Sequence, residues 1–586
     1  MKKAVIDLLV LLTFMTGLAS APAGEVGRIP TPNTTALEMT QMMGNGINLG
    51  NSMETNGRVT LGTSADVSAY ETYWGQPVTT EPMIAGMKES GFDSIRIPIA
   101  WTNMMDYEKG DYTIKEPLMA RVQQLVDWSL ENDMFVIINA HWDGGWWGKF
   151  GSATPATREE ALKMYKAMWT QIATRFKDYD GRLIFEGANE ELGDRLNDTD
   201  VCPDSGALSE DECYTTAHMI NQTFVDLIRS TGGNNTWRFL LIAGYDTDIE
   251  KTCDERYIMP TDSAKDKLLI SVHYYTPWNY CGTTSGAGWG TIADYEEQNR
   301  LLGMMKKFTD QGYGVIIGET AVLPKDDGSL KVNSYEFTEG ILNNCDYYNY
   351  VPMLWDQSAY FVRKELRFSD EDILELFQSR SWDGMSEYSY EAQSAAAKAL
   401  LDKRLAEAPE MLEGQVDLDT VDYGMAWIMF ASDNWNAVYC TSDTYDPTSK
   451  TESIQATDVE IRGPGTYTVK LDFTQNYFHN SFSSGIAFSA LAIGNGERLF
   501  PGYVADITEI KINGKPVELM GKPYTSSDDG RTTRVNLYND WVAAVPDGVR
   551  TSDGKTDGCS AILLDKAKMD HVETLEITFN YGPAGG

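Results

Sequence analysis

Apolar runs and segments of mixed polarity alternate through the first two thirds of the chain. Each run has the length of a buried strand, and most of the segments between them carry apolar residues at helical spacing. The predicted strands cover 44–51, 92–99, 135–141, 183–190, 239–244, 268–275, 314–319 and 350–355. The predicted helices cover 81–90, 117–132, 157–178, 214–231, 294–311, 334–344 and 391–407, and the connection between the fifth and sixth strands predicts only a short helix. Eight strands in alternation with helices predict an α/β fold, the (β/α)₈ TIM barrel.

The pattern changes after this region from helical spacing to strict alternation. Residues 466–473 and 574–579 place apolar and polar side chains at every second position, which is typical of strands with one buried face. Asn513-Gly514 lies between two such stretches and suits the tight turn of a hairpin. We therefore predict a catalytic domain at 24–410 and an all-β accessory domain, a β-sandwich, at 411–586.

The first 23 residues have the pattern of a signal peptide. Two lysines follow Met1, an apolar stretch covers 4–19 with an atypical Asp7 inside it, and small residues follow. Elsewhere the sequence has no apolar run long enough to cross a membrane. The prediction is a leader at 1–23 and a secreted protein.

The overall charge limits the classes of partner. A net charge of −38 repels the phosphates of nucleic acids and the surface of anionic membranes, so neither is an expected partner. Aromatic residues make up 11% of the chain, and tryptophan and tyrosine rings stack on the apolar faces of sugars. This composition is compatible with an uncharged carbohydrate ligand and gives no indication of oligomeric state.

Seven cysteines are present, and an exported protein is expected to pair some of them. Proximity and domain membership suggest three disulfides, with Cys345 left free: Cys202 with Cys213, Cys253 with Cys281, and Cys440 with Cys559. The spacings match no zinc motif, and no glycine-rich nucleotide loop follows a predicted strand. We expect neither a metal nor a cofactor.

Two glutamates occupy the ends of predicted strands, far apart in the sequence. Leu183-Ile-Phe-Glu-Gly-Ala-Asn leads to Glu190, and Gly314-Val-Ile-Ile-Gly leads to Glu319. A carboxylate at the end of an apolar strand is costly unless it is solvated, paired or used in chemistry. Such a pair can supply the acid and the nucleophile of a glycoside hydrolase, although either glutamate alone also fits a solvated strand end.

Further polar and aromatic residues follow the predicted strands in order: Arg96, His141, Asn189, His273, Tyr275 and Trp355. Together with the two glutamates, this set resembles glycoside hydrolase family 5, a large group of retaining endo-β-glycanases with an eight-fold barrel. Asn48-Leu-Gly-Asn51 is similar to the endoglucanase branches of that family. The resemblance covers residues 40–405.

The resemblance implies a role for each residue. Glu190 would be the general acid and later the base, with its pKa raised by the anion at Glu319, and Glu319 would be the nucleophile. Arg96 would keep that nucleophile ionised, and Asn189 would bind the sugar 2-hydroxyl. His141 and His273 would bind sugar hydroxyls or orient the carboxylates. Tyr275 would donate a hydrogen bond to Glu319, and Trp355 would stack under the sugar ring.

Each supporting residue also has a structural interpretation. Arg96 fits an ion pair inside the barrel, the two histidines fit buried core positions, and Trp355 fits core packing. His141 is followed by Trp142-Asp143, which departs from the usual His-His-Glu-like form of the family and leaves the neighbouring sugar subsite open. Four loop tryptophans are either stacking platforms or packing residues: Trp146, Trp147, Trp278 and Trp289.

The predicted function is a secreted retaining endo-β-1,4-glucanase that hydrolyses internal bonds of plant cell-wall β-glucans. The alternatives are a relative that prefers xyloglucan, mixed-linkage glucan, xylan or mannan, and an inactive carbohydrate-binding protein. Aromatic residues of the accessory domain would form a polysaccharide-binding surface or the domain's own core: Trp427, Trp435, Tyr477, Phe478, Tyr503 and Trp541.

Overall fold

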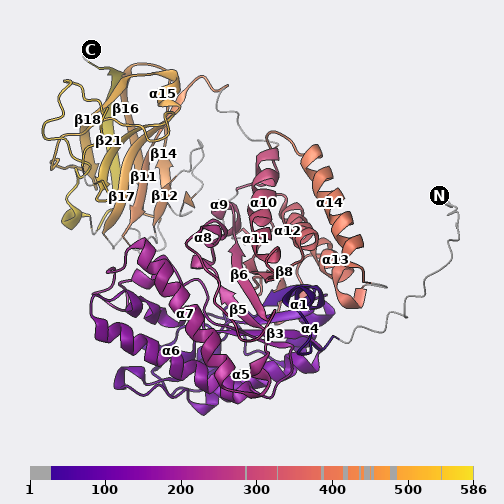
Figure 1. The fold of residues 1–586 in the computed structure, drawn as a ribbon. Coiled ribbons are helices and arrows are strands. Elements are labelled where there is room, and N and C mark those ends of the chain that lie inside the picture. The colour runs from indigo at the N-terminus through magenta and orange to yellow at the C-terminus, as the bar shows by residue number, and fades with distance from the viewer. Residues whose placement is uncertain are drawn as a thin grey trace, which may run out of the picture.

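The computed structural model of the chain describes residues 28–584 except 284–286, 326–327, 385–387, 413–419, 434–436, 441–448, 451–453, 476–484, 543 and 570. The predicted leader at 1–23 lies outside the described residues. Figure 1 shows the α/β body in indigo to salmon and an all-β body in orange and yellow. Within the described part of the chain, no helix has the length and hydropathy needed to cross a membrane.

Eight parallel strands close into a barrel, as predicted. Each strand pairs with the next one in the sequence, and the first pairs with the last through Gly46 and Met353. The strands are β1 (Gly46–Asn48), β2 (Ser94–Ile97), β3 (Phe135–Asn139), β4 (Leu183–Glu186), β5 (Leu240–Ala243), β6 (Leu268–Tyr274), β7 (Gly314–Thr320) and β8 (Tyr350–Leu354). The fourth strand ends four residues before Glu190, so this glutamate lies on the loop after the strand.

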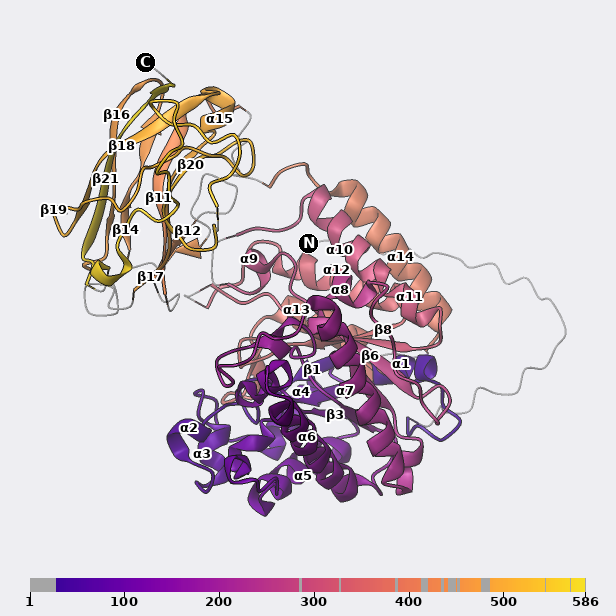
Figure 2. The same ribbon diagram turned by 60° about the vertical axis from the view of Figure 1, so that its left-hand side comes forward.

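Helices surround the barrel, and all of the following except the one at Glu371–Arg380 lie where the sequence predicts them. They are α4 (Glu81–Glu89), α5 (Glu116–Glu131), α6 (Pro155–Phe176), α7 (Glu210–Ser230), α8 (Ile249–Cys253), α10 (Ile292–Met304), α12 (Ser334–Tyr348), α13 (Glu371–Arg380) and α14 (Tyr390–Glu407). The predicted helix 294–311 is divided, because α10 ends at Met304 and a short α11 (Lys306–Thr309) follows. The last helix of the barrel domain, α14, packs along α12 on the outside of the barrel (Figure 2).

The barrel interior is apolar at one end and polar at the other. At the amino end, the helix α1 (Ala36–Met43) packs its methionines against inward-facing apolar residues of the strands. One layer above, the inward positions carry polar groups, all completely buried: Asn48, Arg96, Asn139 and Glu186. Because inward positions recur every second residue along a strand, the side chains that follow lie at the carboxyl end of the barrel.

The C-terminal domain is a sandwich of two antiparallel sheets. One sheet has the order β13-β12-β11-β17-β20, with β15 also paired to β11, and the other has the order β14-β16-β21-β18-β19. The strands are β11 (Gly424–Ser432), β12 (Val438–Cys440), β13 (Ser449–Lys450), β14 (Gln455–Thr457), β15 (Val459–Ile461), β16 (Gly465–Asp472), β17 (Ile486–Gly494), β18 (Tyr503–Ile512), β19 (Lys515–Pro516), β20 (Thr533–Asn539) and β21 (Thr574–Pro583). Phe430 of the first sheet contacts Phe473, which follows β16 of the second, inside one shared apolar core. The β-sandwich prediction is therefore confirmed, as is the tight turn at Asn513-Gly514 between β18 and β19.

The predicted disulfides Cys202–Cys213 and Cys253–Cys281 are wrong. All four are free thiols, as are Cys345 and Cys559, and the side chain of Cys440 lies outside the described residues. The thiols have separate partners: Cys202 donates to Asp204, and Cys253 donates to the carbonyl oxygen of Met304. Closeness in sequence did not bring the sulfur atoms together, although Cys213, Cys253 and Cys281 all pack in or against the same apolar core.

Candidate active site

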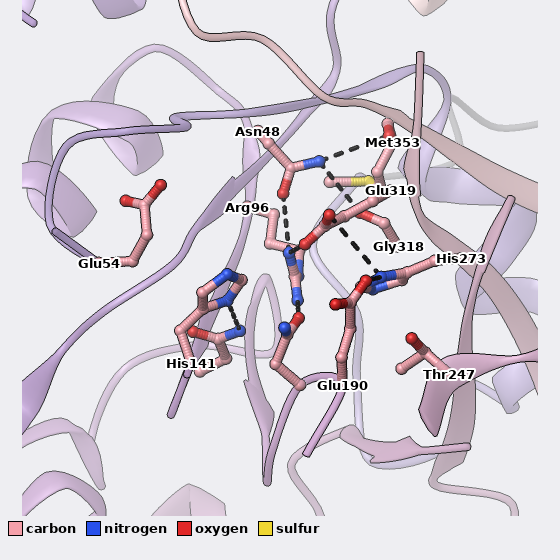
Figure 3. Close-up of polar contacts among 12 residues, drawn as sticks. Asn48, Glu54, Arg96, His141, Glu190, Thr247, His273, Gly318, Glu319 and Met353 are labelled. Atoms are coloured by element: carbon pink, nitrogen blue, oxygen red, sulfur yellow. Dashed lines mark hydrogen bonds and ion pairs between the residues drawn. The ribbon is translucent and has the colours of Figure 1, made fainter. Parts of the chain in front are cut away.

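Arg96 is the centre of a buried polar network at the carboxyl end of the barrel (Figure 3). Its Nε donates to Glu186 Oε2 at 2.7 Å, and its Nη1 donates to both Asn48 Oδ1 at 2.9 Å and Glu319 Oε1 at 2.8 Å. Its Nη2 donates to Asn189 Oδ1 at 2.7 Å, which turns the amide NH₂ of Asn189 away from the guanidinium. Burial acts to lower the pKa of Arg96, but the charges of Glu186 and Glu319 outweigh it and raise that pKa. One arginine thus fixes the orientation of four side chains, which come from β1, from β7, and from β4 and the loop after it.

Glu319 lies in the last part of β7 and is almost fully buried. Its Oε1 accepts from Arg96, and its Oε2 accepts from the hydroxyl of Tyr275 at 3.2 Å. The Nδ1 of His273 is 3.7 Å from the same Oε2. The strand-end prediction is confirmed for its position, because a buried strand delivers this carboxylate to the mouth of the barrel.

Glu190 and Glu319 both approach Nδ1 of His273 (Figure 3). His273 Nδ1 lies 2.9 Å from Glu190 Oε1, and Arg195 Nη1 lies 3.4 Å from Glu190 Oε2. One oxygen of each glutamate and one ring nitrogen of His273 lie within 4.8 Å of one another. The side chain of Glu190 is 28% exposed and that of Glu319 is 8% exposed, so Glu190 is the one that solvent reaches more easily.

The pKa values of the two glutamates are shifted in the directions opposite to those that the resemblance implies. Burial raises the pKa of Glu319, and the charge of Glu190 adds to this effect against the lowering influence of His273 and Arg96. Burial also acts to raise the pKa of Glu190, but the hydrogen bond and charge of His273, with Arg195 and Arg96, outweigh it and lower that pKa. Each glutamate lies within 4 Å of two potential cations, so the difference in pKa follows from the deeper burial of Glu319.

His141 and Trp355 form a second group on the rim. Their rings are nearly parallel, with centroids 6.1 Å apart and 11° between the planes. Asn139 Nδ2 lies 3.1 Å from His141 Nδ1, and its Oδ1 accepts from the amide of Ile99, so the amide orientation makes Nδ1 of His141 the acceptor. Burial lowers the pKa of His141 well below its ordinary value, which keeps the ring neutral with its proton on Nε2.

The four loop tryptophans divide into two kinds. Trp146, Trp147 and Trp289 are fully buried and are packing residues. Trp278 is 64% exposed, and its ring meets Tyr275 edge-on with centroids 6.0 Å apart. Trp278 therefore remains a candidate stacking platform for a sugar, since its exposed ring lies beside Tyr275, which contacts Glu319.

Several buried acids around this site could not be recognised from the sequence. Glu186 pairs with Arg96 and was visible only as the acid that ends the same apolar run as Glu190. Burial raises the pKa of Glu54 and of Asp143 to about 7 and that of Glu191 to about 8. Asp143 accepts from the amide and hydroxyl of Thr102, which ties the loop after β3 to the loop after β2.

Glu191 gives a prediction about stability. It is 1% exposed, and one of its carboxyl oxygens accepts the amide of Asn189 while the other has no hydrogen-bond partner among the described residues. Its folded pKa of about 8 lies above the unfolded value, so the folded state binds the extra proton and its contribution to stability is lost as pH rises through 8. Relative to Glu191→Gln, the wild type should lose about 1 kcal/mol of unfolding free energy per pH unit between the unfolded pKa near 4.5 and the folded pKa of about 8. Urea unfolding at pH 5, 6.5 and 8 measures this, and parallel slopes for the two proteins would contradict it.

Among the described residues, Glu190, His273 and Glu319 are the group of acids, histidines and cysteines close enough to share a metal ion. The guanidinium of Arg96 already occupies the position of a cation beside Glu319. A second cation would meet its repulsion, and the three side chains are better suited to proton transfer than to metal binding.

An eight-stranded barrel with two carboxylates this close at the carboxyl ends of its strands has the architecture of the barrel glycoside hydrolases. Residues 55–360 match the model of the cellulase family, glycosyl hydrolase family 5, and this match covers more than half of the chain. The chain therefore belongs to glycoside hydrolase family 5.

The relatives define the enzyme further as a family 5 endo-β-glucanase. Endoglucanase A of Paenibacillus barcinonensis is 31% identical over 385 residues, which are 61% of this chain and 90% of that protein. A xyloglucan-specific endo-β-1,4-glucanase of Bacteroides ovatus is 30% identical over 55% of this chain and 65% of that protein. The structure of a GH5-4 broad specificity endoglucanase from Ruminococcus champanellensis, with bound cellotriose, matches with a TM-score of 0.52 and 30% identity over 58% of this chain and 98% of that one.

Proposed function

We propose that the protein is a retaining endo-β-1,4-glucanase that cleaves internal bonds of plant cell-wall β-glucans by double displacement. The observation that carries the proposal is the separation of the carboxylates, with an oxygen of Glu190 and an oxygen of Glu319 within 4.8 Å. Retaining glycosidases hold these groups about 5–5.5 Å apart, whereas inverting enzymes leave room for a water molecule at about 6.5–9.5 Å.

In the first step, Glu319 attacks the anomeric carbon while Glu190 donates a proton to the glycosidic oxygen. Arg96 and Tyr275 orient the two oxygens of the nucleophile. A sugar seated between the glutamates removes water from the more exposed Glu190, which raises its pKa and favours the acid form. The two carboxyls are close enough to titrate as a pair, so the ionisation of Glu319 and the protonation of Glu190 support each other.

In the second step, Glu190 is ionised and takes a proton from the water that attacks the glycosyl-enzyme. The contacts with His273 and Arg195 favour this ionised form. Asn189 is held by Arg96 through its carbonyl oxygen, so its amide NH₂ can bind the sugar 2-hydroxyl, a contact that strengthens in the transition state. Trp355 stacks under the sugar, and the Nε2–H of His141 is available as a hydroxyl donor.

The substrate proposal rests on the relatives and on the exposed ring of Trp278 beside Tyr275. One relative is named for xyloglucan and another for broad specificity. Release of reducing ends from a soluble cellulose derivative, barley β-glucan, xyloglucan, xylan and mannan tests it. Activity led by the first three supports a β-1,4-glucanase, and activity led by xylan or mannan overturns the substrate assignment. An absence of activity on all five by folded protein favours a carbohydrate-binding protein instead.

Tyr275→Phe tests the contact with Glu319. The tyrosine donates its hydroxyl to Oε2 at 3.2 Å, and hydrogen bonds to charged groups contribute about 1.5–3 kcal/mol. We expect kcat/KM to fall roughly 10- to 100-fold, because the hydroxyl holds the carboxylate in the orientation for attack. Because the lost bond stabilised the carboxylate, the acid limb of the pH profile should move to higher pH. An unchanged acid limb would contradict this role.

The accessory domain and export are part of the proposal. Trp541 is 64% exposed and stacks on Phe488, whereas Trp427 is buried in the sandwich core. Trp435, Tyr477 and Phe478 lie outside the described residues. A polysaccharide contact would therefore centre on Trp541. Loss of retention on insoluble glucan in Trp541→Ala, with activity on soluble substrate intact, would support it, and full retention would identify the domain as structural.

Processing after residue 23 in an export-competent host tests secretion.

A further inference from the structure

Arg195 contacts the oxygen of Glu190 that His273 does not contact. It lies on η4 (Asp194–Asn197), a single turn in the long loop between β4 and α7. Arg195 Nη1 is 3.4 Å from Glu190 Oε2, and His273 Nδ1 is 2.9 Å from Oε1. The two oxygens are thus held from opposite sides, by a buried histidine and by a half-exposed arginine.

The backbone that carries Arg195 is fixed through the preceding residue. The amide of Asp194 donates to Asp246 Oδ1 at 2.9 Å, and Tyr245 donates its hydroxyl to Asp194 Oδ1 at 2.8 Å. Lys251 Nζ bridges Asp194 Oδ2 at 2.7 Å and Asp246 Oδ2 at 2.8 Å. We call Asp194, Tyr245, Asp246 and Lys251 the loop clamp. It joins the loop after β4 to the loop after β5 and to α8.

Two further features show that this junction is close and specific. A Cβ on Gly193 would lie 2.1 Å from Asp246 Oδ1, so any larger residue would displace the clamp. Asp246 and Thr247 adopt φ values of +49° and +51°, and the left-handed region is strained for a β-branched residue such as threonine. Such strain persists only where surrounding contacts hold it, and it concentrates at functional sites.

We propose that Arg195 is a positioning residue that orients Glu190 and favours its ionised form, and that the loop clamp holds Arg195 in place. This inference rests on the proposed role of Glu190 as acid and base. Arg195 would assist the second step, in which Glu190 is the base, and would oppose proton retention in the first.

The other charged groups around Glu190 come from different elements of the barrel. His273 faces it from β6, Arg96 from β2 and Glu319 from β7, and Glu191 adjoins it in the chain. Arg195 is the charged group on the solvent side, at 52% side-chain exposure. Its removal should therefore alter the titration of Glu190 without disturbing the buried network around Arg96.

Arg195→Gln should move the alkaline limb of the kcat/KM profile to higher pH. This limb reports loss of the proton from the general acid, and one charge near 4 Å in a solvated setting shifts it by roughly 0.5–1 pH unit. Arg195→Lys should keep most of the wild-type profile, and Asp194→Asn should shift it in the same direction as Arg195→Gln by a smaller amount. Raising the ionic strength should move the wild-type limb toward that of Arg195→Gln.

The control is Arg300→Gln, which removes an arginine of similar exposure, 47%, from the outer helix α10 and should leave the profile unchanged. An unmoved alkaline limb in Arg195→Gln overturns the proposal, as does a change confined to KM, which would mark Arg195 as a substrate-binding residue. Failure of the proposed function is a separate result, since it appears as undiminished hydrolysis by Glu190→Gln.

Discussion

Glu319→Gln is expected to abolish practical hydrolysis, with kcat lowered on the order of 10⁴- to 10⁶-fold, as when other covalent nucleophiles or their partners are removed. Gln keeps the size of the side chain and can still accept from Arg96, but its amide does not attack the anomeric carbon. Glu190→Gln removes the proton donor and should cost roughly 10²- to 10⁴-fold, with a smaller loss on substrates whose leaving group needs no proton. Initial rates on barley β-glucan and on an activated aryl glycoside separate the two cases.

Azide makes the role of each glutamate visible in the product. Glu319→Ala leaves space for azide on the nucleophile's side, so the expected product is the glycosyl azide of inverted configuration. In Glu190→Ala, the glycosyl-enzyme still forms on activated substrates, and azide should trap it as the glycosyl azide of retained configuration. Glu131→Gln, at the exposed end of α5, is the control and should behave as wild type. Equal activity in wild type and Glu319→Gln would remove the nucleophile assignment.

Arg96→Met is the second change with a large expected effect, and it acts on stability as well as on rate. The methionine leaves Glu186 and Glu319 buried without their shared cation. Removing one partner of a buried ion pair typically costs about 3–5 kcal/mol. Urea unfolding should therefore show a lower midpoint, and kcat should fall because Glu319 and Asn189 both lose the group that orients them.

The pH profile distinguishes a charge effect from simple loosening of the fold. Arg96 lowers the pKa of Glu319, so its loss should raise that pKa and move the acid limb to higher pH. Arg96→Lys keeps the charge but replaces four directed hydrogen bonds by a point charge, and should recover stability more than activity. A double variant, Arg96→Met with Glu186→Gln, should regain part of the lost stability because it removes one unpaired charge. If Arg96→Met were as stable as wild type, the network would not support the site as described.

The barrel could be predicted because its strands are buried on both faces. An apolar run such as 135–139 has one structural solution in an α/β chain, and its polar neighbour then marks the carboxyl end of the strand. The same reasoning placed Glu190 and Glu319 at one rim although 129 residues separate them in the numbering.

The electrostatics of the site could not be predicted in this way. Glu190 was predicted as the acid, but the pairing of Glu186 with Arg96 was not, since Glu186 stands in the same run and its partner lies on another strand. The contact of Arg195 depends on a loop whose course is set by distant residues on the loop after β5 and on α8. The disulfide predictions failed for the related reason that separation along the chain says little about loops that pack against other loops.

The division of the barrel into an apolar end and a polar end has a consequence for how the enzyme tolerates change. Substitutions among the methionines of α1 should lower the melting temperature and leave the pH profile alone, because they lie a full layer below the titrating groups. Substitutions in the upper layer should do the reverse or affect both. The melting temperature and the pH dependence of the reaction can then be changed at opposite ends of the barrel. Directed evolution could select for each in a separate library, and distant substitutions should combine additively.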